Sequence, residues 1–128
     1  MGQQQLLLII LGVIIVGIAI AVGLSLFSAQ SIQSNKDAMI NDLNNIAAQA
    51  YQYKVRPSSM GGGQGSYASF TIPTKMATNE NAVYVASNAG ATSVTVTSTS
   101  NQNTSNTIVV VVDSDSRLTS WTYTGDFQ

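Results

Sequence analysis

The first quarter of the chain is apolar on every face that a helix would present. From Leu6 to Phe27 the residues are almost all Leu, Ile, Val, Ala and Gly, and no charged residue comes before Lys36. Roughly 22 residues at about 1.5 Å each give about 33 Å of helix, which matches a bilayer core about 30 Å thick. This apolar segment, Leu6–Phe27, is predicted to lie in lipid or among helices of its own kind.

After Phe27 the pattern becomes one-sided. Apolar side chains recur at steps of three, four or seven, and polar side chains fill the positions between them, which predicts an amphipathic helix. The apolar set is Ile32, Met39, Leu43, Ile46, Ala47, Ala50 and Tyr53, and the polar set is Asn35, Asp37, Asn41, Asp42, Asn45, Gln49 and Gln52. Arg56 precedes the first proline, Pro57, and is therefore biased away from helix. We expect one helix from about Gln3 to about Val55.

Short apolar and polar alternations in the rest of the chain predict β-strands. They fall at Ala68–Ile72, Val83–Val85, Val94–Thr97 and Leu118–Thr124, the last with Trp121 and Tyr123 on one side and Ser120 and Thr122 on the other. The unbroken run Ile108–Val112 predicts a central strand buried on both faces. We therefore expect an α+β fold in which one long N-terminal helix packs against a C-terminal antiparallel sheet of four to five strands.

The pattern divides the chain into three parts. Residues 1–28 form the apolar part of the helix, residues 29–56 its amphipathic continuation, and residues 57–128 an antiparallel β-domain. A glycine-rich stretch, Pro57–Gly65, opens the β-domain. It has no following lysine and joins a helix to a strand, so it is interpreted as a linker or turn and not as a phosphate-binding loop.

Composition narrows the function. The chain has 128 residues with 5 Lys and Arg, 6 Asp and Glu, no His, no Cys and a formal net charge of −1. It lacks the basic surface that nucleic-acid binding needs, so no nucleic acid is predicted as a partner. It also lacks the commonest general base and metal ligand, and any thiol. We expect no enzyme activity and no cofactor.

Two groups of residues suggest surface chemistry, each with a simpler alternative. Asp113 and Asp115, with Glu80 or Asp126, offer the oxygen ligands that Ca²⁺ prefers, but paired aspartates in a turn are more often turn formers, so no metal site is predicted. Asn103-Thr104-Ser105 matches the N-glycosylation pattern, and the Ser and Thr residues from Thr92 to Thr107 are candidate O-glycosylation sites. The alternative is an unmodified polar hairpin.

The aromatic residues Tyr51, Tyr53, Tyr67 and Phe70 cluster in sequence around the end of the predicted helix. An electron path through them is one interpretation. Packing where the helix meets the sheet is the simpler one.

The N-terminus is atypical of a secretory signal peptide, which has a basic start and an apolar core of about 7–15 residues. Met1 to Gln5 contain no Lys or Arg, and the apolar segment is longer than such a core, although Ser28-Ala29-Gln30 resembles a weak cleavage site. The positive-inside rule therefore has almost no charge on which to act. We expect that the insertion signal lies elsewhere or that a short basic leader precedes Met1.

Small residues recur within the apolar segment at a spacing of four. The pairs are Gly17 with Ala21, Ala19 with Gly23, and Ala21 with Ser25. Such pairs let helix backbones approach closely, although glycine is also simply common in membrane helices. Because each glycine costs about 1 kcal/mol of helix propensity relative to Ala, a local loosening of the helix between Gly17 and Gly23 is also expected.

The order of a long helix, apolar then amphipathic, a loop and an antiparallel sheet resembles the type IV pilin family. Gly2 followed by three glutamines and the run from Leu6 is similar to the junction at which a dedicated prepilin peptidase cleaves family members, here between Gly2 and Gln3. One departure is that Gln5 and its neighbours offer only amides where bacterial pilins usually carry a glutamate. Another is the lack of a disulfide-closed C-terminal loop.

The resemblance implies a subunit that is inserted in the inner membrane, is handled by pilus assembly machinery and forms a helical homo-oligomeric filament at the cell surface. The implied assembly interface comprises Leu6, Leu7, Ile10, Val13, Gly17, Ala21 and Gly23. Two other functions stay open. One is a single-pass membrane-anchored protein whose exported β-domain binds a partner or polysaccharide, and the other is a minor pseudopilin of a secretion apparatus.

Overall fold

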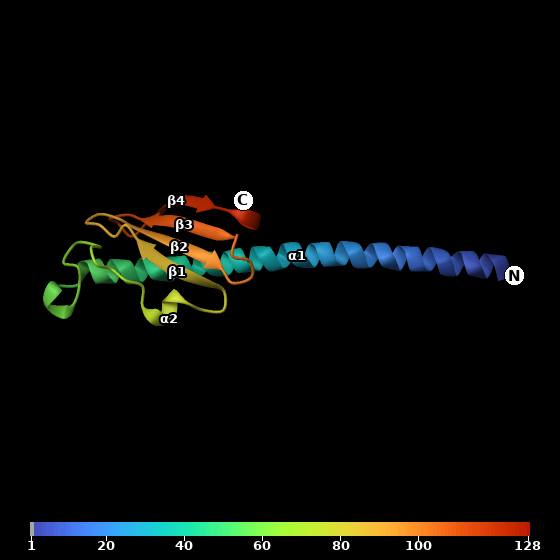
Figure 1. Ribbon diagram of the computed structural model, residues 1–128, viewed down its shortest axis with the longest axis horizontal. Helices are drawn as coiled ribbons and strands as arrows, with labels where there is room; N and C mark the ends of the chain where they lie inside the picture. Colours follow the sequence, from blue (N-terminus) through green and yellow to red (C-terminus); the bar gives the residue numbers. More distant parts are fainter. Residues whose placement is uncertain (1) are drawn as a thin grey trace. The chain divides into compact units, whose positions relative to one another are not determined.

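The structure is a computed structural model that describes residues 2–128 (Figure 1). It has an α+β fold with one long N-terminal helix and a four-stranded antiparallel sheet, as the sequence predicts. In chain order the elements are α1 (Gly2–Val55), η1 (Ser58–Met60), α2 (Thr74–Ala77), β1 (Ala82–Ser87), β2 (Val94–Ser100), β3 (Thr107–Val112), β4 (Leu118–Tyr123) and η2 (Gly125–Phe127).

The chain divides into two compact units. The first comprises the chain up to Gln33, and the second, called the folded unit below, runs from Ser34 to Gln128. In the first unit the described residues are helical without interruption, so the expected loosening between Gly17 and Gly23 is not found. The folded unit holds the rest of α1, all four strands and the core.

The four strands pair in sequence order, β1-β2-β3-β4, and every pair is antiparallel. This confirms the predicted antiparallel sheet. Asn88 adopts a left-handed backbone conformation (φ 50°) in the connection from β1 to β2. Asparagine tolerates that conformation better than most residues because its short polar side chain bonds locally, so the connection can turn tightly.

The prediction of a strand at Ala68–Ile72, the first of the five in chain order, is wrong. Ser69 has a left-handed backbone (φ 67°), and the amide of Phe70 donates to the carbonyl of Tyr67 at 2.9 Å, so the chain turns instead of extending. Tyr67 is fully buried and Phe70 nearly so. Tyr67, just before this stretch, and Phe70 within it are therefore aromatic anchors that hold a loop against the core.

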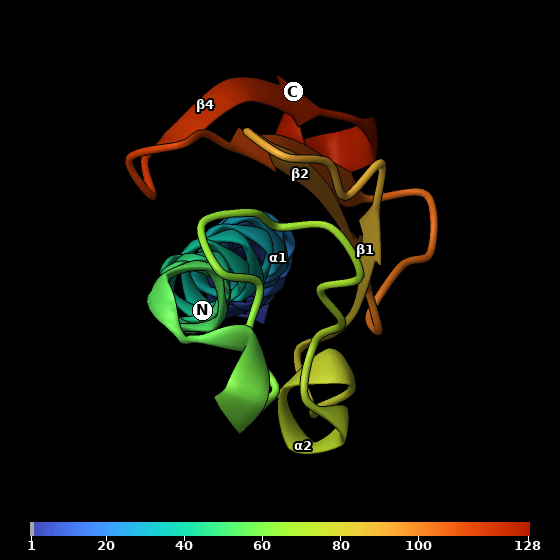
Figure 2. The ribbon, with the colours of Figure 1, turned by 90° about the vertical axis from the view of Figure 1, so that its left-hand side faces the viewer.

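The prediction that β3 is buried on both faces is also wrong. Ile108, Val110 and Val112 are buried, whereas Val109 and Val111 are only half-buried. In the folded unit a helix covers one face of the sheet, as Figure 2 shows. The valines that point to the other face are therefore less buried, although the run of valines is continuous. The outward valines extend an uncharged outer face.

The core lies between α1 and the inner face of the sheet. On the helix side Met39, Leu43 and Ile46 are fully buried, and Ala47 and Ala50, which follow them along the helix, are buried too. The inner faces of β2 and β3 contribute Val94, Val96, Ile108, Val110 and Val112, and β1 contributes Ala82 and Tyr84. Full burial of one such aliphatic side chain is worth about 1.5–3 kcal/mol, so this seam supplies much of the stability of the folded unit.

Asn35, assigned by its pattern to the polar side of the helix, is 5% exposed. It lies four residues before Met39 and therefore on the same helix face. Its Nδ2 donates to the carbonyl of Asn81 at 3.2 Å, and its Oδ1 accepts from the hydroxyl of Ser100 at 2.6 Å. A buried polar group with partners so distant in sequence fixes the helix in one register against β1 and β2.

A β-bulge sets which way the aromatic residues of β4 point. Val111 pairs with Thr119 but Val109 pairs with Thr122, so β4 has one extra residue there, and Ser120 has a left-handed backbone (φ 55°). One extra residue reverses the alternation of a strand. Beyond the bulge, Tyr123 pairs with the buried Ile108, so Tyr123 and Trp121, two positions before it, point to the inner side of the sheet, with ring centroids 6.1 Å apart.

The glycine-rich stretch caps the C-terminus of α1, which the linker interpretation did not include. The amide of Gly63 donates to the carbonyl of Tyr53 at 2.7 Å, and that of Gln64 to the carbonyl of Arg56 at 3.0 Å. The last carbonyls of a helix have no partner within it, and this loop provides one. A side chain at Gly63 would place its Cβ 1.9 Å from the carbonyl oxygen of Ser66, so only glycine fits.

Candidate functional site

The apolar segment is the strongest candidate for a functional surface. Every residue from Gly2 to Gln30 is exposed, and the large apolar side chains from Leu6 to Phe27 are each between 53% and 73% exposed. Ordinary soluble proteins do not leave such an apolar surface in contact with water. The segment therefore needs lipid or other protein chains around it.

Packing within the described residues does not require the glycines of this segment. A Cβ added at Gly12, Gly17 or Gly23 would meet no described atom within 4 Å outside the local helix backbone. Each nevertheless costs about 1 kcal/mol of helix propensity relative to Ala. Gly63 is the opposite case, since its own loop excludes a side chain. The apolar segment has small residues where an external partner can approach closely.

Helix α1 brings most of the predicted assembly interface onto one face. At 3.6 residues per turn, Leu6, Ile10 and Val13 lie in line with Gly17 and Ala21. Leu7 is turned about 80° from the centre of this row and Gly23 about 120°. We call the five aligned residues the small-residue face, because two of them, Gly17 and Ala21, have small side chains that let another helix approach closely.

The candidate processing junction lies in the first turn of α1. Gly2 begins the helix, and Gln3 follows it as an exposed helical residue. Met1 lies outside the described residues. The first turn contains no acidic residue, although acidic side chains are the ones that stabilise a helix N-terminus.

Asn103 is exposed at the turn between β2 and β3. Its Oδ1 accepts from the amide of Ser105 at 3.0 Å, and its Nδ2 lies 3.5 Å from the carboxylate of Asp126. The first contact is that of a side chain shaping its own turn. The glycosylation pattern is thus on an accessible loop, and its use stays a prediction.

The candidate calcium ligands do not come together. Asp113 uses one oxygen, Oδ1, to accept from the amides of Asp115 at 2.9 Å and Arg117 at 2.8 Å, which are the contacts of a turn former. Asp126 instead accepts from Asn106 at 3.3 Å. Among the described residues no group of three or more acidic side chains is close enough to hold a metal ion.

The aromatic residues near the end of α1 make packing contacts. The rings of Tyr53 and Phe70 are 5.5 Å apart, and the hydroxyl of Tyr53 donates to the carbonyl of Ala68 at 2.9 Å. Tyr67 donates to the carbonyl of Asp113 at 2.6 Å. Tyr53 thus fastens the loop to α1, and Tyr67 fastens it to the connection after β3, which favours the packing interpretation over an electron path.

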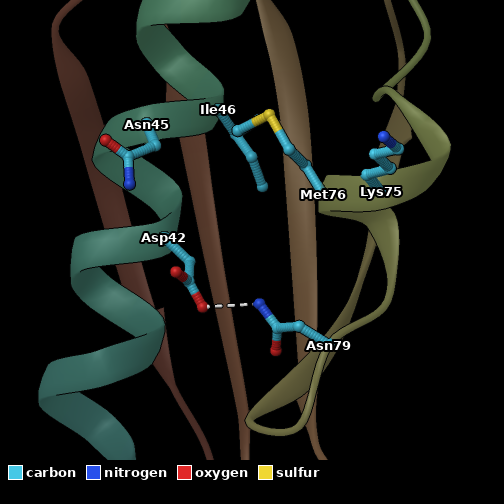
Figure 3. A pocket seen from close by; sticks show the side chains of 6 residues that line it. All are labelled: Asp42, Asn45, Ile46, Lys75, Met76 and Asn79. Atoms are coloured by element: carbon cyan, nitrogen blue, oxygen red, sulfur yellow. Dashed lines mark hydrogen bonds between the residues drawn. The ribbon is translucent and has the colours of Figure 1, made fainter.

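A cavity of about 140 Å³ lies between α1, α2 and the segment that follows α2 (Figure 3). It is lined by Asp42, Asn45, Ile46, Lys75, Met76 and Asn79. Asp42 Oδ2 accepts from Asn79 Nδ2 at 2.9 Å and from the Tyr84 hydroxyl at 2.6 Å. These partners are 37 and 42 residues away, so no local sequence signal could have revealed them. The bonds of Asp42 to Asn79 and Tyr84 join the helix to β1 and to the segment before it.

Tyr84 makes the folded unit less stable as the pH rises in the alkaline range. Burial, together with donation to Asp42, raises the pKa of Tyr84 well above that of a free tyrosine. Above about pH 10 the unfolded chain loses this proton while the folded chain keeps it, so the free energy of unfolding falls as pH rises. We expect chemical denaturation midpoints of the full chain in detergent to decrease from pH 9 to pH 11.

The matched variant is Tyr84→Phe, which keeps the ring and removes the titrating hydroxyl. It should be about 1–2 kcal/mol less stable at pH 7, because Asp42 loses a buried donor, and its alkaline loss should be shallower. An identical pH dependence in Tyr84→Phe and the parent chain would show that other groups control the effect. Tyr67, whose pKa is also raised by burial, is the next candidate.

Among the described helices, α1 is long and apolar enough to cross a membrane. A signal sequence near the N-terminus would satisfy the same criteria of length and composition. No family model, curated protein or solved structure matches the chain. Its function is therefore inferred from the exposed apolar segment and the folded unit.

Proposed function

We propose that the chain is a structural subunit of a type IV pilus-like extracellular filament and polymerises through its apolar segment. The observation that carries this proposal is the exposure of every side chain from Leu6 to Phe27 in a chain that also has a separately packed folded unit. Apolar surface removed from water is worth about 25 cal/mol per Å². A filament core made of many such helices keeps each of them from water.

The small-residue face explains why helices would leave lipid for each other. Lipid is as apolar as leucine, so burial alone does not favour assembly over the membrane. Close backbone packing at Gly17 and Ala21 adds van der Waals contacts that lipid provides less well. On this basis the chain is membrane-inserted before assembly and at the cell surface afterwards.

The folded unit suits the water-facing part of such a subunit. Its core is complete without the apolar segment, since Met39, Leu43 and Ile46 are buried within it. It can therefore stay folded while the segment exchanges lipid for neighbouring helices. A prepilin peptidase acting between Gly2 and Gln3 and a pilus assembly machinery are the partners this pathway requires.

Electron microscopy of material sheared from intact cells tests the proposal directly. An antibody raised against residues 60–128 should label thin filaments in this material. Label found only on membrane vesicles, with none on sheared filaments, would contradict it. Mass spectrometry of the labelled filaments should then find an N-terminal peptide that begins at Gln3.

A second candidate function is favoured by the length of the apolar segment. Roughly 22 residues match the thickness of a single bilayer, as a permanent single-pass anchor requires. In that case the folded unit is an exported domain that binds a partner or polysaccharide. Carbonate-washed membranes would then retain all of the protein as monomers, and shearing would release none.

A further inference from the structure

The inner side of β4 is less covered than that of its neighbours. Strands β2 and β3 bury their inner side chains in the core, whereas Trp121 and Tyr123, on the edge strand, are only half-buried. The planes of the two rings differ by 9°, and their centroids are 6.1 Å apart. Trp121 and Tyr123 therefore form one partly open aromatic surface, called the aromatic pair below.

The polar atoms of the aromatic pair are directed to the surroundings of the folded unit. The hydroxyls of Tyr53, Tyr67 and Tyr84 each donate to a group of the folded unit. The indole N–H of Trp121 and the hydroxyl of Tyr123 have no such partner among the described residues, and neither atom is enclosed in the protein. A half-buried ring with an accessible polar tip is typical of Trp and Tyr at membrane surfaces.

The aromatic pair lies at the end of the folded unit where α1 enters it. Lys36 Nζ is 4.4 Å from the centroid of the Tyr123 ring and donates to the carbonyl of Phe127 at 3.3 Å. Lys36 follows closely on Ser34, the first residue of the folded unit, and is the first charged residue of the chain. Lysine beside Trp and Tyr suits a membrane surface, because its alkyl stem covers apolar groups while its ammonium stays among polar ones.

The chain itself brings this end of the folded unit to a membrane. Residues 28–33 are all that separates Phe27, where the apolar segment ends, from Ser34. This connection covers about 10 Å as a helix and about 25 Å if fully extended. The headgroup region reaches about 5–8 Å beyond the hydrocarbon core on each side of a bilayer. Where the apolar segment crosses a bilayer, the start of the folded unit is consequently within reach of the headgroups.

We infer that the aromatic pair inserts into the headgroup region of that bilayer and holds the folded unit against the membrane surface. The inference rests on the membrane-inserted state of the proposed function, which the single-pass alternative shares. Ester and phosphate oxygens of lipid accept from the indole N–H and the tyrosine hydroxyl. A second copy or a polysaccharide would have to reach the pair by diffusion, whereas lipid is within reach of every inserted chain. Lys36 also lies over the Tyr123 ring, which leaves less of that ring for a sugar to stack on.

Trp121 is the only tryptophan, so its fluorescence reports on this surface alone. The full chain is reconstituted in phosphatidylcholine vesicles at a low ratio of protein to lipid, which keeps the copies apart. The lipid has bromine atoms, which quench tryptophan, either near the headgroups or near the ends of the acyl chains. We expect the bromines near the headgroups to reduce Trp121 fluorescence about twofold or more and those near the chain ends to have little effect, because interfacial indoles lie at headgroup level.

Two variants in a Trp121→Phe background are the controls. Tyr51→Trp exchanges one exposed aromatic side chain for another, about 22 Å along α1 from Lys36, and neither lipid should quench it. Val16→Trp lies in the middle of the apolar segment, and the bromines near the chain ends should quench it most strongly.

The controls separate failure of this inference from failure of the proposed function. Trp121 unaffected by either lipid, with Val16→Trp quenched, would overturn the inference and leave membrane insertion standing. Quenching of that Trp121 by acrylamide would then show that water covers the pair, and resistance to acrylamide that another copy does. Equal quenching of Trp121 and Tyr51→Trp would also overturn it, because the contact would not be specific to the aromatic pair. If Val16→Trp is not quenched, the chain is not inserted, and both proposals fail.

Discussion

Gly17→Leu is expected to abolish filament formation while leaving the folded unit intact. Gly17 lies on the small-residue face, and a Cβ there would meet no described atom within 4 Å outside the local helix backbone, so the single subunit accommodates the leucine. Between two packed helices the added side chain forces the backbones apart and removes the close contacts that distinguish a protein neighbour from lipid. Sheared material examined by electron microscopy should contain no labelled filaments.

The matched control is Val16→Leu, which adds bulk one position away where the side chain is already large and 58% exposed. It should assemble normally. Ala21→Leu, on the same face as Gly17, should behave like Gly17→Leu. Urea denaturation followed through Trp121, the only tryptophan, should give the same midpoint for all three variants and the parent chain. Normal filaments from both Gly17→Leu and Ala21→Leu would contradict the assigned face.

The periodic parts of this fold could be predicted from the sequence. Met39, Leu43, Ile46, Ala47 and Ala50 repeat at helical spacing, and all five are buried in the structure. The helix end at Val55 follows from Pro57 and its effect on the preceding residue. Strong periodicity over many residues shows which face of a helix meets the core. These predictions could therefore be made without knowing the sheet on which the helix packs.

The errors occur where a partner distant in sequence decides the outcome. Ala68–Ile72 alternates like a strand, but Phe70 within it is an anchor for a loop, as is Tyr67 just before it. Asn35 is polar and nevertheless buried, because Asn81 and Ser100 complete its hydrogen bonds. Asp42 likewise belongs to a contact with Tyr84 that only the folded chain creates. Residue type alone does not reveal such contacts.

For the candidate site, the exposure of the apolar segment follows from its all-round apolar pattern. The assembly interface that the resemblance implies has seven positions, and helix geometry separates them into two groups. Leu6, Ile10, Val13, Gly17 and Ala21 share a face, whereas Leu7 and Gly23 point elsewhere. A two-sided contact, in which different faces meet different neighbours, would use both groups.

Gly63→Ala is expected to destabilise the folded unit by about 2–4 kcal/mol. The new Cβ would lie 1.9 Å from the carbonyl oxygen of Ser66 and 2.9 Å from the Tyr53 ring, and backbone atoms cannot yield that much. The loop would have to move away from α1. That movement breaks the bond from the Gly63 amide to the Tyr53 carbonyl and leaves a helix carbonyl without its cap.

The effect of Gly63→Ala should reach the core because the capping loop leads directly to Tyr67 and Phe70, the anchors that close one side of it. Gly61→Asn is the matched control: it places a larger side chain in the same loop, at a left-handed position (φ 79°) with open space that asparagine tolerates, and should cost only a few tenths of a kcal/mol. Equal urea midpoints for Gly63→Ala, Gly61→Asn and the parent chain would show that the glycine-rich stretch only links α1 to the sheet and does not stabilise the folded unit. A loss confined to Gly63→Ala would show that glycine is required there by close backbone packing.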